Sequence, residues 1–226
     1  MSSENDRDTA DDAPLSPEQM LALVKDQQRS IAGQRGAFVH WILVAWGVAW
    51  LAGFGALWLA SGGLAGVTVP IQVAAPVFAA LLIAAGILSS ILGIRSDRGV
   101  RDQQGAFAGA AYGQLWWVGG LVIFVMGQAL VFNGMQQALL GVFYPSAFIF
   151  FAGVMYVMAG VLWRAIPMVV LGGWSLLLSA VAPFFGMPTH YLVFALAGGG
   201  GFLIAALWSW LWTRRVRRRL DAGTRS

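Results

Sequence analysis

Residues 37–60 read AFVHWILVAWGVAWLAGFGALWLA, an apolar run without a charged side chain. A helix needs roughly 20 residues to cross about 30 Å of hydrocarbon, so this run is long enough to span a bilayer. Because a chain in lipid must satisfy its backbone hydrogen bonds internally, we expect it to be helical. The sequence therefore predicts an all-α, polytopic membrane protein with six transmembrane helices. The other five runs lie at residues 71–94, 115–132, 139–163, 168–185 and 191–212.

The placement of basic residues predicts how these helices are oriented. Arginine and lysine occur before the first run, between the second and third, between the fourth and fifth, and after the last. The other three connections contain neither residue. Since short basic loops stay on the cytoplasmic side, we expect both termini in the cytoplasm. A single lysine, with abundant alanine and glycine, is typical of a GC-rich bacterial genome, so the predicted location is the bacterial cytoplasmic membrane.

The composition predicts one domain embedded in lipid, residues 37–212. The chain is 58% hydrophobic and 11% charged, with a net charge of +4, which is the pattern of the membrane class. The positive charge belongs to one membrane face, so we expect anionic lipid headgroups rather than nucleic acid as its partner. Residues 213–226 form the basic cytoplasmic tail. The arginines expected to contact headgroups or a cytoplasmic partner are Arg95, Arg98, Arg101, Arg214 and Arg215.

Two different segments precede the first run. Residues 1–15 are acidic and almost without apolar side chains, so we expect a disordered tail. Residues 16–36 begin with Ser16, Pro17 and Gln19, which form the signature of a helix start. Apolar residues then recur at helical spacing. We expect a cytoplasmic amphipathic helix that lies in the membrane interface or docks a partner.

The connections without basic residues are short, which predicts three antiparallel hairpins of helices one and two, three and four, and five and six. Small residues repeat every four positions in the last run. Such stripes let helix backbones approach closely in lipid. The glycines at 198–201 favour either a tight crossing or a hinge. The predicted packing residues of the last helix are Ala197, Gly201, Ala205 and Ser209.

The sequence contains no complete catalytic or metal-binding motif, so we expect no enzyme activity, no cofactor and no metal. It has no cysteine, no Walker A sequence and no His-Glu-x-x-His sequence. Ser175 lacks the following glycine of a rhomboid protease, and the two histidines, His40 and His190, lie at opposite ends of predicted spans. Interface anchoring accounts for both histidines. For His190, a role as an external pH sensor is the alternative.

Polar side chains within the predicted spans allow two interpretations. They line a path for a neutral or amphiphilic substrate, or they form hydrogen bonds between helices that contribute about 1 kcal/mol or less each. Most tryptophans fall near predicted span ends and form an interfacial belt, whereas Trp46, Trp50 and Trp174 lie deeper, where they line a cavity or pack. The candidate polar positions are Ser89, Ser90, Gln128, Ser175 and Ser179.

Three stretches carry a resemblance to other proteins: residues 16–35, the run VAWGVAWL at 44–51, and RGVR at 98–101, which leads into AYG at 111–113. Together they resemble uncharacterised six-helix membrane proteins of actinobacteria, which are often labelled transporters or permease-like. The layout is more loosely similar to short bacterial acid-resistance membrane proteins. The resemblance implies a fold and a general class, and it carries over no binding or catalytic residue.

Two functions follow as hypotheses. The first is a small permease-like transport component without its own ATPase, whose partner would be an ATP-binding-cassette subunit. The second is a non-transporting membrane protein that acts in envelope stress response or regulation. The sequence leaves a homo-oligomer open in both cases.

Overall fold

A computed structural model of the chain describes residues 16–96 and 103–223, with side chains placed for 16–21, 39–93, 105 and 107–215. All regular structure in this part of the chain is helical. Six helical stretches are long and apolar enough to cross a membrane, which confirms the predicted all-α fold with six candidate spans. The predicted acidic tail and the residues Arg98 and Arg101 lie outside the described residues.

The first helix, α1 (Pro17–Ala60), starts as the sequence predicts. The backbone N–H of Gln19 donates to the Ser16 hydroxyl at 3.2 Å, and the Ser16 N–H donates to the Gln19 side chain at 2.9 Å. The helix then continues without interruption into the candidate span Val39–Ala60. A separate amphipathic helix at 16–36 is not confirmed, because this segment is the beginning of α1 and the side chains of 22–38 are not described.

The remaining elements follow in order along the chain. They are α2 (Ile71–Ser96), α3 (Gln103–Phe132), the short η1 (Gln137–Leu139), α4 (Leu140–Leu162), α5 (Ile166–Val181) and η2 (Ala182–Phe185). The last span combines α6 (Thr189–Val193), η3 (Phe194–Gly199) and α7 (Gly200–Gly223), and η3 has π-helical geometry. The third candidate span begins at Phe107 rather than at residue 115, because α3 extends further toward its N-terminus.

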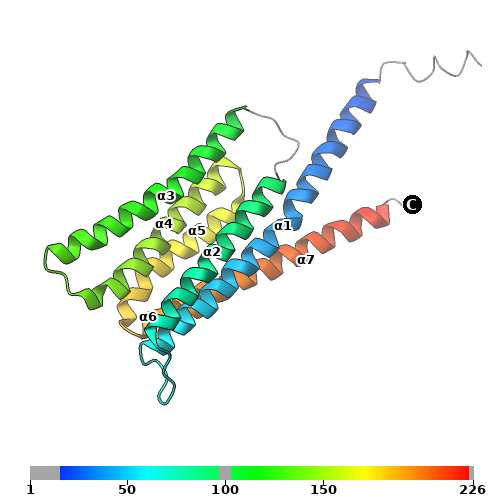
Figure 1. The fold of residues 1–226 in the computed structure, drawn as a ribbon. Helices are drawn as coiled ribbons and strands as arrows, with labels where there is room; N and C mark the ends of the chain where they lie inside the picture. Colours follow the sequence, from blue (N-terminus) through cyan, green and yellow to red (C-terminus); the bar gives the residue numbers. More distant parts are fainter. Residues whose placement is uncertain (1–15, 97–102, 224–226) are drawn as a thin grey trace, which may run out of the picture.

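The spanning helices form two groups of three that pack against each other side by side (Figure 1). We call these the α1–α2–α7 group and the α3–α4–α5 group. Within the first, α1 packs against both α2 and α7; within the second, α4 packs against both α5 and α3. The expected arrangement of three hairpins is not confirmed, since the main neighbour of α5 is α4 and the main neighbour of α7 is α1.

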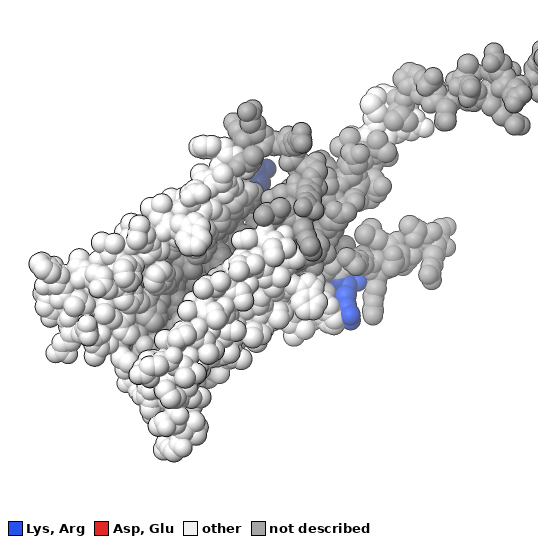
Figure 2. Space-filling view, viewed as in Figure 1, with Lys and Arg blue, Asp and Glu red and all other residues white. Residues whose placement is uncertain are grey.

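The two ends of the bundle differ. We call the end where α1 begins and α7 finishes the terminal end, and the opposite end the turn end (Figure 1). The turn end carries the connections 61–70, 133–136 and 186–188, which contain no charged residue. In the space-filling view, blue side chains lie only toward the terminal end, and the described surface of the spanning helices is white (Figure 2). An even number of spans accounts for both described chain ends lying at one end of the bundle.

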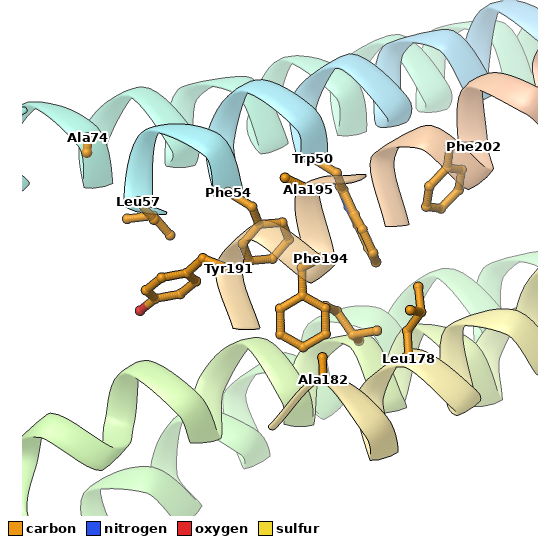
Figure 3. Packing of buried hydrophobic residues seen from close by; sticks show 11 residues of the cluster. Trp50, Phe54, Leu57, Ala74, Leu178, Ala182, Tyr191, Phe194, Ala195 and Phe202 are labelled. Atoms are coloured by element: carbon orange, nitrogen blue, oxygen red, sulfur yellow. The ribbon is translucent and has the colours of Figure 1, made fainter. Parts of the chain in front are cut away.

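The buried core lies where the two groups meet (Figure 3). Phe194 from η3 is fully buried, and its ring centroid lies 5.3 Å from that of Phe54 on α1. Trp50 meets Phe202 edge to face at 5.1 Å. Aromatic pairs of this kind add directional contacts to the burial of apolar area. The cluster contains Trp50, Phe54, Leu57, Ala74, Ile149, Leu178, Ala182, Tyr191, Phe194, Ala195 and Phe202.

Candidate functional site at the seam between the helix groups

The candidate site is the seam, by which we mean the line where α6, η3 and the start of α7 contact α1 on one side and α4 and α5 on the other. On the α1 side the two backbones touch. A Cβ atom added to Gly199 would lie 2.7 Å from the backbone nitrogen of Leu51 and 2.9 Å from the carbonyl oxygen of Gly47. No side chain fits there, so glycine is required for this approach.

The π-helical turn η3 is held from both sides by tryptophan. Trp174 of α5 donates its indole N–H to the carbonyl of Ala197 at 3.0 Å. Trp50 of α1 packs against Gly198, where an added Cβ atom would lie 2.6 Å from the ring. A π turn shifts backbone carbonyls out of the regular helical ladder, and such turns are frequent at functional sites. The deep tryptophans Trp50 and Trp174 therefore pack against the seam.

Of the two roles predicted for the glycines at 198–201, the contacts match a tight crossing. The crossing lies at a slightly different position from the predicted stripe of small residues. Gly201 lies against Trp174 on the α5 side, where an added Cβ would be 2.8 Å from the indole nitrogen. The backbone contact with α1 is made instead by Gly199, two residues earlier. The other members of the predicted stripe, Ala197, Ala205 and Ser209, are half-buried.

A second close crossing joins α4 to α5 within the other group. A Cβ atom added to Gly172 would lie 2.7 Å from the carbonyl oxygen of Gly153 and 2.7 Å from the backbone nitrogen of Val157. This contact explains why α4 and α5 form the tightest pair in their group. Both crossings depend on glycine, because lipid provides no hydrophobic drive for helix association and close packing has to replace it.

The predicted polar positions do not gather at one place. Ser89 and Ser90 lie on α2, Gln128 on α3, and Ser175 and Ser179 on α5. Each serine hydroxyl donates to a carbonyl of its own helix: Ser89 to Ala85, Ser90 to Gly86, Ser175 to Leu171 and Ser179 to Leu176, at 2.8 to 2.9 Å.

Two of these polar residues also join neighbouring helices. Ser89 accepts the indole N–H of Trp46 at 2.9 Å and so links α2 to α1. Gln128 donates to the hydroxyl of Tyr144 at 2.9 Å and links α3 to α4. Because these groups already have partners, the geometry of the described residues matches the interpretation as helix-to-helix hydrogen bonds.

An open apolar groove lies between α4 and α5. Its volume is about 620 Å³, and its two polar side chains, Ser146 and Ser179, both donate to backbone carbonyls. A smaller groove of about 330 Å³ lies between α1 and α2. Such linings suit acyl chains or other apolar groups. The larger groove is lined by Val142, Phe143, Ser146, Ala147, Phe150, Leu176, Ser179, Ala180 and Pro183.

The described basic side chains lie at the terminal end. The guanidinium carbon of Arg214 lies 3.5 Å from the ring centroid of Trp210, which is a cation–π contact. Arg215 is exposed. Arg95 belongs to the last turn of α2, but its side chain is not described, so the predicted surface of Arg95, Arg98 and Arg101 stays a prediction.

His190 lies buried at the turn end. From the sequence, only interface anchoring or external pH sensing is predicted for it. Both its ring nitrogens face backbone carbonyls: Nε2 lies 2.9 Å from the oxygen of Gly141, and Nδ1 lies 3.1 Å from that of Gly186. The sequence signal for this contact was Pro145, four residues after Gly141, because proline leaves that carbonyl without its helical donor. No local pattern in the sequence relates Pro145 to His190, which lies on another helix.

Within the described residues, no three His, Cys, Asp or Glu side chains are grouped so that they could hold a metal ion. Comparison with known proteins found no match: no family model, no curated protein and no solved structure matches the chain. The resemblances to actinobacterial six-helix proteins and to acid-resistance proteins therefore stay hypotheses. The six apolar helices themselves are compatible with a multi-pass integral membrane protein.

Proposed function

We propose that the chain is a small permease-like transport component that lacks its own ATPase and moves a neutral or amphiphilic molecule by rocking of its two helix groups about the seam. The observation that carries this proposal is the seam itself. Two three-helix groups meet there through a glycine crossing and a π-helical turn, Phe194–Gly199. Transport by rocking of one helix group against another uses a boundary of this kind.

The chemistry of the spans limits the substrate. No Asp, Glu, Lys or Arg occurs at residues 36–94, 103–163 or 165–213. A charged substrate would enter a region without a counter-charge, and a bare charge in hydrocarbon is costly. The apolar groove between α4 and α5 suits an acyl chain or a similar group. A neutral or amphiphilic molecule fits this environment better than an ion.

The same absence of Asp, Glu, Lys and Arg bears on the energy source. Coupling through carboxylates within the membrane would need residues that these spans lack. The chain also lacks a Walker A sequence, so ATP-driven movement requires another polypeptide. In this proposal an ATP-binding-cassette subunit docks on the beginning of α1 and on residues 95–114. The protein lies in the bacterial cytoplasmic membrane with both termini in the cytoplasm.

The test is gentle solubilisation of the tagged protein from its native membrane, followed by quantitative mass spectrometry of what stays bound. We expect an ATP-binding-cassette protein at near-equal amount, lost when Arg95, Arg98 and Arg101 are replaced together by alanine. The matched control replaces Arg217, Arg218 and Arg219 by alanine, which removes the same charge from the tail. The proposal would be overturned if the chain is recovered without a bound ATPase from membranes in which ATP-binding-cassette proteins are present.

One observation favours the second function, a non-transporting role in envelope stress response or regulation. The serine hydroxyls of the spans donate their protons to backbone carbonyls, so they have no proton left to donate to a substrate. The two functions are distinguished by replacing Ser89, Ser90, Ser175 and Ser179 by alanine and Gln128 by leucine in a complemented deletion strain. If this variant accumulates normally but no longer supports export, transport is supported. If both export and stress survival are unchanged in this variant, regulation is supported.

A further inference from the structure

The last span contains one turn that departs from the regular helical ladder. Its two ends, α6 and α7, are α-helical, whereas η3 between them, Phe194–Gly199, has π-helical geometry. The backbone hydrogen bonds of a π turn reach one residue further along the chain than those of an α turn. Relative to a regular helix, the last span therefore carries one extra residue at the point where it crosses the seam.

The parts of the span on either side of η3 contact different helix groups. On one side, His190 of α6 lies against α4, with its Nε2 2.9 Å from the oxygen of Gly141. On the other side, α7 packs on α1, where Phe202 meets Trp50 edge to face at 5.1 Å. Because α6 has only five residues and follows the short connection 186–188, it is the smaller part. A change in the turn would move α6 rather than α7.

A hydrogen bond from another helix ends on this turn. Trp174 of α5 donates its indole N–H to the carbonyl oxygen of Ala197 at 3.0 Å. This bond depends on where the π turn places that carbonyl. Gly198 and Gly201 carry no side chains and so leave room for the indole rings of Trp50 and Trp174, which lie against them. The described contacts therefore hold the extra residue in the turn from the α1 side and from the α5 side.

A regular α-helix across η3 would bring other side chains to the seam. Absorbing the extra residue turns α6 by about 100° and shifts it by about 1.5 Å, which are the rotation and rise of one helical residue. Each side chain before the turn then takes the place of its predecessor in the chain. Ala195 would replace Phe194, and Leu192 would replace Tyr191. The fully buried ring of Phe194 is thereby exchanged for a methyl group.

Opposing contributions act on the two registers. The π register buries Phe194 against Phe54, with ring centroids 5.3 Å apart, and it makes the bond from Trp174 to Ala197. The α register loses both contacts but gains the regular backbone ladder that helices generally adopt, since π turns are rare. A helix with one contribution on each side has two discrete arrangements, and a single side chain such as Trp174 is placed to choose between them.

We propose that η3 is a register switch: while Trp174 is bonded to Ala197 the extra residue stays in the turn and Phe194 fills the seam, and when this bond breaks α6 turns by one residue and Ala195 takes that place. Small register shifts of packed helices are an established form of conformational change. Trp174 is a positioning residue, because it acts through the turn. The switch requires neither transport nor a partner protein, so failure of the transport proposal leaves it intact.

The first experiment reads the register by cysteine cross-linking. Figure 3 shows Phe194 directed toward Ala182 of η2 and Ala195 on the α1 side of the last span. The chain has no cysteine, so Ala195→Cys with Ala182→Cys gives a single pair. Under mild oxidation in nanodiscs, we expect little disulfide in this protein and several-fold more after Trp174→Phe, which keeps an aromatic ring and removes the N–H donor. Cross-linking that Trp174→Phe leaves unchanged would overturn the switch.

The second experiment removes the extra residue. Leu196 lies within η3 and is 60% exposed, so deleting it costs little packing and leaves α6 and α7 in their places. The shortened turn has no second register. We therefore expect the deletion to abolish the rise in cross-linking that Trp174→Phe produces. A rise that persists in the shortened protein would indicate general loosening of the seam and would contradict the switch.

Deletion of Ile204 is the matched control, because this residue is 70% exposed and lies in the regular helix α7 of the same span. Its loss turns the following residues by about 100° and displaces the buried Ala206. We expect thermal unfolding in nanodiscs close to that of the wild type for the Leu196 deletion, and a large loss of stability for the Ile204 deletion. Equal damage from both deletions would mean that η3 holds no extra residue, and the switch would be wrong.

Discussion

At the residue scale, Arg164 occupies a backbone conformation that its side chain does not favour. It lies two residues after the end of α4 at Leu162 and has a φ angle of +51°. Ala165 donates to the carbonyl of Gly160 at 2.8 Å, and Arg164 donates to that of Val161 at 3.4 Å. This is the helix-ending pattern in which glycine usually occupies the left-handed position. Arginine at this position supplies the one basic residue of the fourth connection.

We predict that Arg164→Gly is more stable than Arg164→Ala by about 1 kcal/mol, because alanine keeps the left-handed strain that glycine avoids. Both variants remove the same charge, so the comparison separates backbone strain from electrostatics. Equilibrium unfolding of the two purified variants in the same lipid measures the difference. Equal stability would show that Arg164 does not need a positive φ in the protein.

At the element scale, two crossings hold the helices together, and each has an adjacent glycine with open space. Gly199 and Gly172 meet backbone atoms of neighbouring helices, whereas nothing lies within 4 Å of a Cβ atom added to Gly200 or Gly173. Small-residue spacing alone pointed to Ala197 and Gly201. The structure moves the closest contact to Gly199, because the π turn changes which face of the last span meets α1.

We predict that Gly199→Ala destabilises the protein by about 2 kcal/mol, since the methyl group would force two backbones apart. Gly200→Ala, one position along, should be neutral or up to about 1 kcal/mol stabilising, because alanine is the better helix former. The pair Gly172→Ala and Gly173→Ala should repeat this contrast in the other helix group. Thermal unfolding in nanodiscs measures all four variants. A Gly199→Ala protein as stable as Gly200→Ala would mean that α1 and η3 do not touch.

At the scale of the whole molecule, both described chain ends lie at one end of the bundle (Figure 1). The basic connections predict that this end faces the cytoplasm. The absence of cysteine makes the orientation simple to test, since a single introduced cysteine is the only thiol. Positions in the uncharged connections, such as Ala65 and Gln136, are exposed.

We predict that a membrane-impermeant maleimide labels Ala65→Cys and Gln136→Cys in intact cells. The variant Ser226→Cys should react only after the cells are permeabilised, because the basic connections predict a cytoplasmic C-terminus. The cysteine-free wild type is the background control. Labelling of Ser226→Cys in intact cells, with protection of the other two positions, would reverse the proposed orientation.

The sequence by itself determined the six spans and the start of α1, because length, hydropathy and capping are local properties of a chain. Runs such as 37–60 are helical in lipid whatever their neighbours are, and Ser16 and Gln19 cap α1 within a single turn. Only the tertiary structure decided which helices pack together. It pairs α5 with α4 and α7 with α1, and brings His190 to Gly141, 49 residues away. Apolar faces in lipid are nearly interchangeable, so partner choice depends on close contacts such as Gly199 with Gly47, which no local pattern specifies.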